Sequence, residues 1–445
     1  MQINETIGIL GFGVEGASSL KYLIREGFKK IVIMDKKEIQ LPEIPKDISV
    51  QIFSGEDYLK GLNECDTVIR SAGIYPLSKE LLDFQMQGKE LTSQANIFFD
   101  SVETSHIIAV TGTLGKGSTV SMIEHILNCA KIKNAVGGNF GIPMLDLLSE
   151  DMDEQIFVLE LSSFQLMTLG VSPSIGVVLK VTSEHLDWHR SVEEYRDAKT
   201  NLVRYQRKND FCIYSSDETP SAEIAKNSSA QKLSFGKDKN ATVQVLKDSF
   251  SIGKETLLLS DCKVKASYQL ENMAAAALAT LALGVDISLI FEALKSYQSL
   301  PLRMEFKGEF SGIEFYNDSY ATRPDATIAA IESMTRPFTL ILGGSEKNAD
   351  FSLLFETCKK NALLKNIVFI GATAKRMEAE AKTYLNIPLE IFDTLELAFE
   401  KALKIGKGGA VLLSPACASF GLFKNYKVRG EVFNKLVQVF SEKSL

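Results

Sequence analysis

The sequence has few cysteines and no strong excess of one charge. Its six cysteines lie far apart, at positions 65, 129, 212, 262, 358 and 417, and none forms a C-x-x-C pair. This spacing suggests neither a disulfide framework nor a zinc knuckle, so a reducing cytoplasm is the expected compartment. The net charge of −7 comes from acidic and basic residues mixed along the chain, which argues against nucleic acid as the main partner.

The sequence also lacks a long apolar run and a leader of secretory type. The first residues, MQINETIGILGFG, contain no basic segment followed by an apolar stretch. The longest nearly uninterrupted apolar stretch, MAAAALATLALGV at 273–285, is shorter than the roughly 20 residues that a membrane span needs, so a buried helix is expected there. No fixed-period repeat or low-complexity segment occurs. These absences favour a soluble enzyme without a membrane partner.

The 445 residues contain three successive alternations of short β-rich runs and helical stretches. Apolar runs such as TIGILGFG, HIIAVTG and FTLILGG end in small or polar residues. This rhythm predicts an α/β chain of three domains, each a mainly parallel sheet covered by helices. We expect the domains at 1–93, 94–300 and 301–445, and an antiparallel excursion within 211–265, where the strands are shorter and more polar.

The first expected domain opens with a glycine loop, GILGFGVEG. Gly11, Gly13 and Gly16 stand between a predicted strand and a predicted helix, and Asp35 ends the next strand. This spacing is typical of a backbone cradle for a diphosphate at a helix N-terminus. The alternative is a tight turn without a ligand. The motif alone does not distinguish NAD from another nucleotide diphosphate.

A second glycine loop, VTGTLGKGST at 110–119, resembles a nucleotide loop of the G-x-x-G-K-[ST] kind. Backbone N–H groups around Gly112 to Gly115 would surround the phosphates, and Lys116 would contact the β- and γ-phosphoryl oxygens. The hydroxyl that normally follows the lysine and binds Mg²⁺ is absent, because position 117 is glycine. Ser118 or Thr119 is expected to take over that role. The alternative is a flexible turn with a surface lysine.

Three further residues point to metal-assisted phosphate chemistry. Glu160 ends the apolar run VLE, His185 lies in VTSEHLDWH, and Lys199 follows in EEYRDAK. Taken together after a phosphate loop, Glu160 and His185 are candidate ligands of Mg²⁺ ions that bridge ATP and an acceptor. A zinc pair formed by His185 and His189 on one helix face is the alternative.

The order of these motifs over nearly the whole chain resembles the Mur ligase family of ATP-dependent amide-forming enzymes of peptidoglycan synthesis. The resemblance rests on TGTLGKGST, GGNFGIP, LELSSFQL, VTSEHLDWH, EYRDAK, LPLRMEF, YNDSYAT, ILGGSEKNADF and LSPACASFGLFKNYKVRG. Within the family, GFGVEG with Asp35, SAG at 71–73 and SPACASF are most similar to the branch that adds D-glutamate to UDP-N-acetylmuramoyl-L-alanine. The resemblance implies Rossmann-like first and third domains and a P-loop ATPase-like central domain, in a monomer.

The resemblance also implies a set of site residues. It places the UDP-sugar on the first domain and on one central residue, namely on Gly13, Val14, Glu15, Asp35, Lys36, Ser71, Gly73 and Asn139. It places ATP on Gly112, Thr113, Leu114, Gly115, Lys116, Gly117, Ser118, Thr119, Asn272, Arg303 and Asp318. It places the incoming glutamate on Thr322, Lys347, Ser419 and Tyr426.

For the chemistry itself the resemblance implies catalysis by Lys116, Glu160, His185 and Lys199. Lys199 corresponds to a lysine that is carboxylated on Nζ in this family, which converts a cation into an anion able to bind Mg²⁺. Two Mg²⁺ ions are expected, and the implied ligands are Ser118, Glu160, His185 and Lys199. Besides Gly117, the sequence departs from the family's pattern at Tyr320, where a lysine is expected, at Gln269, and at SAG in place of Ser-Pro-Gly.

Three rival interpretations explain less of the sequence. An NAD-dependent oxidoreductase would use GFGVEG and leave TGTLGKGST without a role. A folylpolyglutamate-type ligase would lack the first domain. A non-enzymatic ATP-binding module would have no use for Glu160, His185 and Lys199 together.

Overall fold

The computed structural model describes residues 1–139, 141–149, 152, 154–182, 184–185, 187–264, 266–346 and 348–443. The chain forms two compact units. The first consists of Met1–Leu257 and Glu271–Leu294, and the second of Leu258–Leu270 and Lys295–Leu445. The chain therefore passes between the units at three places. Each unit is described by itself.

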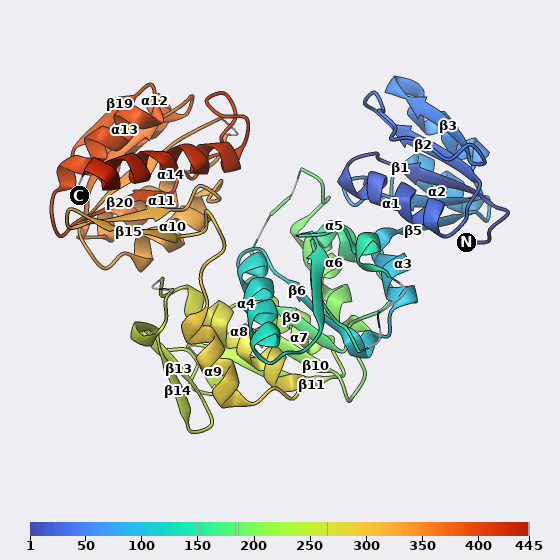
Figure 1. Ribbon diagram of the computed structural model, residues 1–445, viewed down its shortest axis with the longest axis horizontal. Helices are drawn as coiled ribbons and strands as arrows, with labels where there is room; N and C mark the ends of the chain where they lie inside the picture. The colour runs from blue at the N-terminus through green and yellow to red at the C-terminus, as the bar shows by residue number, and fades with distance from the viewer. Residues whose placement is uncertain are drawn as a thin grey trace. The chain divides into compact units, whose positions relative to one another are not determined.

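The first sheet, coloured blue in Figure 1, is parallel and has the strand order β3-β2-β1-β4-β5. Its strands are β1 (Thr6–Leu10), β2 (Lys30–Asp35), β3 (Ser49–Ser54), β4 (Thr67–Arg70) and β5 (Glu90–Ser93). The intervening helices are α1 (Val14–Arg25), η1 (Gly55–Glu64) and α2 (Lys79–Met86). Because the order reverses between β1 and β4, the loops after these two strands flank the crevice in which open α/β sheets bind ligands.

The second sheet, also in the first unit, has the order β12-β11-β10-β9-β6-β8-β7, and all its pairs are parallel. Its strands are β6 (Ile107–Thr111), β7 (Asn134–Gly138), β8 (Ile156–Glu160), β9 (Ile175–Val178), β10 (Phe211–Ser215), β11 (Gln231–Gly236) and β12 (Val243–Gln244). The prediction of an antiparallel excursion over 211–265 is therefore wrong for β10 to β12, which extend the parallel sheet. β13 (Ser249–Ile252) and β14 (Glu255–Leu258) form a separate two-stranded sheet.

Helices connect and cover the strands of this second sheet. They are α3 (Gln94–Ser101), η2 (Thr104–His106), α4 (Lys116–Cys129), η3 (Met144–Leu147), α5 (Ser163–Leu166), α6 (Val192–Arg204), α7 (Thr219–Lys226), α8 (Gln269–Ala282) and α9 (Ile287–Ser296). The short helix η4 (Leu259–Asp261) belongs to the second unit. The alanine-rich α8 is buried along Met273 to Ala279, as its composition predicts. Among the described residues, no helix has the length and apolarity to cross a membrane.

The third sheet belongs to the second unit and has the order β15-β16-β20-β17-β18-β19. Its strands are β15 (Glu305–Phe310), β16 (Ile313–Asn317), β17 (Phe338–Leu342), β18 (Leu364–Ile370), β19 (Leu389–Phe392) and β20 (Ala410–Leu413). β15 is antiparallel to β16, and the other pairs are parallel. The helices are α10 (Pro324–Ser333), α11 (Ser352–Lys360), α12 (Ala374–Tyr384), α13 (Leu395–Ala402), η5 (Leu403–Ile405) and α14 (Tyr426–Lys443).

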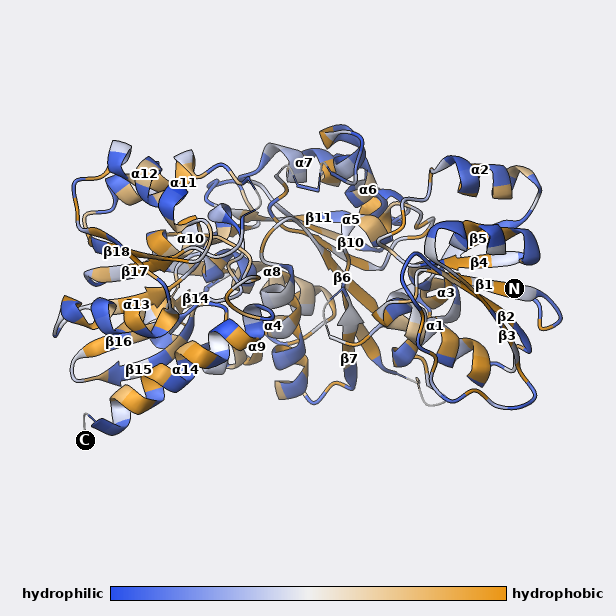
Figure 2. Ribbon diagram, turned by 90° about the horizontal axis from the view of Figure 1, so that it is seen from above, coloured by the Kyte–Doolittle hydropathy of each residue, from blue (hydrophilic) through white to orange (hydrophobic). Residues whose placement is uncertain are grey.

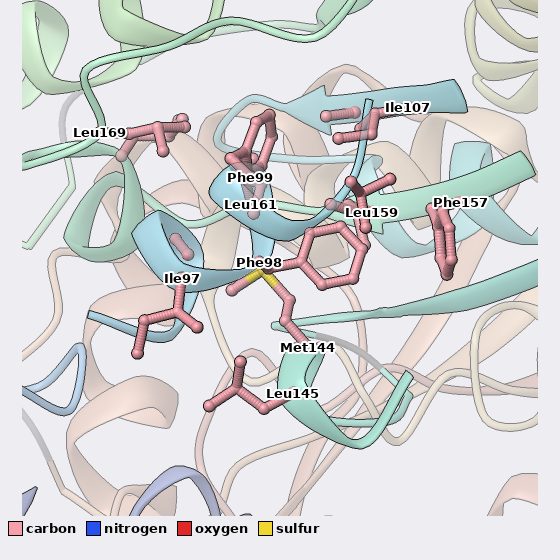
Figure 3. Packing of buried hydrophobic residues seen from close by; sticks show 14 of the residues in the cluster. Ile97, Phe98, Phe99, Ile107, Met144, Leu145, Phe157, Leu159, Leu161 and Leu169 are labelled. Carbon is pink, nitrogen blue, oxygen red and sulfur yellow. The ribbon is translucent and has the colours of Figure 1, made fainter. Parts of the chain in front are cut away.

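The first two sheets share one hydrophobic core, which explains why they form a single unit. The core contains Ile7 and Ile9 of β1 together with Phe157 and Leu159 of β8. In Figure 3, side chains of α3, η3, β6 and β8 gather around Phe98, whose ring centroid lies 5.2 Å from that of Phe157. In Figure 2 the strands are mostly hydrophobic and helices such as α2 carry both colours, as expected for sheets covered by helices.

The three sheets lie within the three domain ranges expected from the sequence, and β5 ends at Ser93. The boundaries of those domains stay predictions. The mainly parallel α/β class of all three is confirmed.

Candidate active site

The first glycine loop joins β1 to α1 as its spacing predicts. Gly11 has φ +88°, and a Cβ there would lie 3.0 Å from Cβ of Ser71, so the loop needs glycine. A Cβ at Gly16 would lie 2.3 Å from the Gly11 carbonyl oxygen, which shows how closely α1 packs against the loop. Gly13 caps α1, and Val14 begins it. The loop therefore presents a helix N-terminus, where an anion is stabilised by N–H groups and the helix dipole.

The loop after β4 lies directly beside the first glycine loop. The Ser71 hydroxyl donates to the Gly11 carbonyl at 2.7 Å, and the Ala72 N–H donates to Oε2 of Glu15 at 2.7 Å. A Cβ added at Gly73 would meet nothing within 4 Å, and the same holds for Gly13. Open space therefore borders both loops at the crevice of the sheet.

Asp35 braces this crevice from the end of β2. Its Oδ2 accepts from the Phe12 N–H at 2.6 Å, and its Oδ1 accepts from the Lys37 N–H at 2.8 Å. Lys36, between these residues, is exposed. The carboxylate thus fixes the glycine loop, and the expected contacts of Asp35 and Lys36 with uracil stay predictions.

The second glycine loop follows β6 and leads into α4. A Cβ at Gly112 would lie 2.8 Å from Cβ of Leu179, and a Cβ at Gly115 would lie 2.3 Å from Oδ1 of Asn272. Gly115, with φ +84°, is the N-cap of α4, which has no side-chain cap hydrogen bond. Leu114 and Gly117 lie in this loop and the first turn of α4. The local backbone is thus a tight cradle at the N-terminus of a 14-residue helix.

Two lysines meet at the carbonyl group of Gly112. Nζ of Lys116 donates to the carbonyl oxygens of Gly112 and Thr113, both at 3.0 Å. Nζ of Lys199 donates to the Gly112 carbonyl at 2.9 Å and lies 3.3 Å from Oγ1 of Thr111. Lys199 is buried, and burial, together with the nearby charge of Lys116, holds its pKa well below the usual range. Both effects favour the neutral form of the amine over the ammonium.

Glu160 supplies a buried carboxylate on the neighbouring strand. Its Oε1 accepts from Nδ2 of Asn139 at 2.6 Å. Within the described part of the chain, its buried Oε2 has no hydrogen-bond partner. An unsatisfied buried carboxylate oxygen is costly, and a hard cation such as Mg²⁺ prefers oxygen ligands of this kind. Glu160 and Glu184 both act electrostatically on Lys199, so the donor chemistry here fits a magnesium ion.

His185 lies near this region in a left-handed backbone conformation, with φ 56°. Its ring packs against Phe164 at a centroid distance of 4.8 Å, and Nε2 lies 3.5 Å from Glu184. His189 is buried, and its Nε2 lies 2.9 Å from the hydroxyl of Ser163. Across the described ranges, no three His, Cys, Asp or Glu side chains come together as a metal group. The magnesium role of His185 stays a prediction.

Tyr195 is a site residue that the sequence did not single out. Its hydroxyl lies 2.9 Å from Oγ1 of Thr113, and its ring lies 4.7 Å from Nζ of Lys199. The signal that could have revealed it is the spacing of four residues between Tyr195 and Lys199, which places both on one face of α6.

Residues of α4 and α8 complete the second loop. Ser118 and Thr119 are both buried, and Oγ1 of Thr119 lies 3.4 Å from Oδ1 of Asn272. Asn272, expected to contact ATP, therefore adjoins the loop from α8.

In the second unit, the two residues expected at ATP lie in one region. Asp318 is buried, and it accepts from the Met304 N–H at 3.0 Å and from the Ser414 hydroxyl at 2.7 Å. Burial raises the pKa of Asp318 to about 7. The Arg303 guanidinium lies 3.6 Å from the ring centroid of Tyr320, the residue that departs from the family's lysine. An aromatic ring here thus holds an arginine in place.

The residues expected to bind glutamate lie on two neighbouring loops and at the start of α14. The rings of Tyr320 and Tyr426 are 4.9 Å apart, and Thr322 follows in the same loop as Tyr320. The buried Arg429 guanidinium donates to the carbonyl oxygens of Ser319 and Cys417, which ties this loop to the one that carries the buried Ser419. Lys347 lies outside the described residues.

Family models match most of the chain. The Mur ligase middle domain matches residues 110–280, and the Mur ligase glutamate ligase domain matches residues 302–417. A UDP-N-acetylmuramoylalanine–D-glutamate ligase of Koribacter versatilis is 34% identical over 446 residues, covering 98% of this chain and 97% of that protein. The ligase of the same name in Acetivibrio thermocellus is 33% identical over 456 residues, covering 98% and 96%.

Solved structures show the same fold. The MurF ligase of Thermotoga maritima in complex with ADP matches with a TM-score of 0.63 at 19% identity, covering 100% of this chain and 97% of that one. The UDP-N-acetylmuramate–alanine ligase MurC of the same organism matches with a TM-score of 0.59 at 15% identity, covering 98% and 100%. With two family models over most of its length and relatives above 30% identity along nearly all of it, the chain belongs to the Mur ligase family.

Proposed function

We propose that this protein is an ATP-dependent ligase that joins D-glutamate to UDP-N-acetylmuramoyl-L-alanine, a step of peptidoglycan synthesis. The observation that carries the proposal is the nearly full-length similarity to ligases named for this reaction. The two phosphate-type loops of the first unit agree with it, because the reaction uses a nucleotide sugar and ATP. The products are UDP-N-acetylmuramoyl-L-alanyl-D-glutamate, ADP and phosphate.

The chemistry explains why ATP is needed. A carboxylate resists attack by an amine because oxide is a poor leaving group, and transfer of the γ-phosphoryl group to the L-alanine carboxylate gives an acyl phosphate. The free amine of D-glutamate then attacks the acyl carbon, and phosphate leaves. Lys116, at the mouth of the second loop, would stabilise negative charge on the transferred phosphoryl group and on the tetrahedral intermediate.

Two Mg²⁺ ions are proposed at the second loop, held by Ser118, Glu160, His185 and a carboxylated Lys199. Mg²⁺ would neutralise the charge of the phosphate oxygens during transfer. The buried Oε2 of Glu160 and the lowered pKa of the buried Lys199 amine, which lies beside Gly112, support this assignment. The Lys199 amine would attack the carbon of CO₂ and lose a proton, which gives a carbamate anion that can bind a cation.

The substrates are assigned by loop. The UDP-sugar is proposed at the first sheet, on Gly13, Val14, Glu15, Asp35, Lys36, Ser71, Gly73 and, from the second sheet, Asn139. ATP is proposed on residues 112–119 and Asn272, with Arg303 and Asp318 of the second unit. D-Glutamate is proposed on Thr322, Lys347, Ser419 and Tyr426, where a cation and hydroxyls suit two carboxylates.

A phosphate-release assay with ATP, Mg²⁺ and UDP-N-acetylmuramoyl-L-alanine, run against a panel of D- and L-amino acids, tests the proposal. We expect release with D-glutamate alone. Release with a different amino acid would reassign the specificity, and no release with any would remove the proposed reaction. In the same assay Lys199→Ala should be inactive and regain partial activity with added small carboxylic acids. Full activity of Lys199→Ala would refute the carboxylated lysine.

A monomer in the cytoplasm is the proposed state of the enzyme. Light scattering of the purified protein at micromolar concentration measures the oligomeric state. Fractionation of the source cells measures the compartment in which the protein occurs.

A further inference from the structure

Each carbonyl group of the loop at residues 71–74 accepts a hydrogen bond from the side chain of Arg70 or of Trp188. Nη1 of Arg70 donates to three of them, at distances of 3.2, 3.0 and 2.5 Å, in Ser71, Ala72 and Ile74. Nε1 of Trp188, the single tryptophan of the chain, donates to the fourth, in Gly73, at 2.8 Å. Four consecutive carbonyl groups are thus fixed by two side chains.

Arg70 is an unusual donor because it is buried and, within the described part of the chain, forms no direct ion pair, although the nearby charge of Glu15 acts on it. It is 1% exposed. Burial lowers its pKa to about 10, so the guanidinium still carries its charge at neutral pH. A buried charge is costly unless hydrogen bonds replace its hydration. Here backbone carbonyl groups accept from Nη1 and Nη2, whereas Nε has no partner among the described residues, so the charge depends on the shape of the loop.

Arg70 also joins this loop to the elements that follow Glu160. Nη2 donates to the carbonyl group of Phe164 at 3.2 Å and lies 3.4 Å from Oγ1 of Thr168. In parallel, Nε2 of Gln165 donates to Oε1 of Glu15 at 3.0 Å. Phe164 and Gln165 belong to α5, the short helix after the strand that ends in Glu160. One guanidinium therefore links the 71–74 loop to α5 and to Thr168, which follow the strand β8 of the second sheet.

The orientation of the carbonyl groups decides where the N–H groups point. The described chain has no cis peptide bond, and in a trans peptide the C=O and the following N–H point in opposite directions. Because the carbonyl groups of Ala72 and Ile74 face Arg70, the N–H groups of Gly73 and Tyr75 face away from it. Open space borders Gly73 on the crevice, as it does Gly13. An anion held on the side away from Arg70 would meet these two N–H groups, while the Gly73 carbonyl group is already engaged by Trp188.

We propose that Arg70 is a positioning residue for the nucleotide sugar: by holding the carbonyl groups of the 71–74 loop, it aims N–H groups at the diphosphate. The inference rests on the proposed function. It adds to that function a residue that acts through the backbone of the diphosphate loop and that links this loop to α5.

The test compares Arg70→Lys with Arg25→Lys. Lysine keeps the charge but carries its donors on one nitrogen, so it cannot span the loop and α5 as the guanidinium does. Arg25 is the matched control, because its Nη1 donates to the carbonyl group of Leu148 and so also links the first sheet to the second sheet's elements, away from the 71–74 loop. Binding of UDP-N-acetylmuramoyl-L-alanine is measured by calorimetry without ATP, and KM is measured for each substrate.

We expect Arg70→Lys to raise the Kd and KM for the nucleotide sugar by about tenfold or more, because charge-assisted hydrogen bonds are lost. The KM for ATP should change by less than about twofold. Arg25→Lys should leave all of these values near those of the wild type. An unchanged Kd in Arg70→Lys, or an equal rise in both KM values, overturns the inference.

Trp188→Phe is the second variant if Arg70→Lys does not fold. It removes the donor to the Gly73 carbonyl and keeps an aromatic ring against Tyr75 and Phe164. The expected result is a selective rise, of about threefold or more, in the Kd for the nucleotide sugar. An unselective change or none overturns the inference. Failure of the wild type to bind the nucleotide sugar would instead refute the proposed function, so the two failures are distinguishable.

Discussion

At the scale of single residues, Gly117 cannot bind Mg²⁺ through a side chain, so a hydroxyl further along α4 must take the place of the one that normally follows the lysine. The Thr119 hydroxyl is already engaged, because it donates to Oδ1 of Asn272 at 3.4 Å. Ser118 stands next to Gly117 in the first turn of α4 and is buried. Ser118 is therefore the better candidate to replace the missing hydroxyl.

This assignment predicts different effects of two substitutions. Ser118→Ala should lower kcat by at least the roughly 10- to 100-fold that is typical of the loss of groups supporting a metal site, and it should raise the Mg²⁺ concentration needed for half-maximal activity. Thr119→Ala should lower stability more than it alters the Mg²⁺ requirement. Phosphate release measured against Mg²⁺ concentration, with urea unfolding of each variant, checks both. The opposite ranking would assign the hydroxyl to Thr119.

The sequence predicted much of the second loop at this scale and little of what surrounds it. Lys116 and Lys199 were expected at one site, and both donate to the Gly112 carbonyl. Tyr195 and Arg70 were missed, because an isolated tyrosine or arginine has no motif and its role depends on burial and on neighbours distant in sequence. Asp35 was expected as a ligand residue, and the structure adds that its carboxylate accepts from the glycine loop itself.

At the scale of elements, alternation of apolar runs and helices predicted the parallel sheets but failed at 211–265. β10 and β11, with five and six residues, are as long as the other strands, and only β12, with two residues, is shorter and lies at the edge of its sheet. An edge strand is covered less completely than a central one, so its sequence is more polar and resembles an antiparallel strand with one solvent face. β11, whose first residues are exposed, shows the same effect.

The short helix α5 offers a prediction about element stability. Ser162 is its N-cap residue. The Ser162 hydroxyl accepts a hydrogen bond from the Gln165 N–H, and Oε1 of Gln165 accepts one from the Ser162 N–H, so the two residues form a capping box. A four-residue helix cannot stabilise itself through its own propensity. Ser162→Ala should therefore lower the free energy of unfolding by about 1 kcal/mol, as the loss of an N-cap does.

Ser78→Ala is the control for this cap. Ser78 is the N-cap residue of α2 but makes no side-chain cap hydrogen bond, so its replacement should change the free energy of unfolding by less than about 0.5 kcal/mol. Urea unfolding followed by circular dichroism compares the two variants. Equal losses in both would mean that the hydroxyl of Ser162 adds nothing specific to α5.

At the scale of the whole molecule, the residues proposed for one substrate are divided between two compact units. Lys116 and Asn272 belong to the first unit, whereas Arg303 and Asp318 belong to the second. All four residues proposed for D-glutamate also lie in the second unit, and the UDP-sugar loops lie in the first. Because an amine must reach an acyl carbon for the reaction to occur, binding of the substrates should favour arrangements that bring the units together.

Small-angle X-ray scattering measures this directly. The radius of gyration should decrease when a non-hydrolysable ATP analogue and UDP-N-acetylmuramoyl-L-alanine are added together with Mg²⁺. Arg303→Ala should weaken the decrease, because it removes the nucleotide contact proposed for the second unit and the cation packed on Tyr320. Arg336→Ala should not, because this arginine of the same unit pairs with Glu309 on the surface. A radius of gyration that stays constant with both ligands bound would mean that the units already hold their working arrangement. An equal effect of Arg303→Ala and Arg336→Ala would mean that Arg303 has no specific part in bringing the units together.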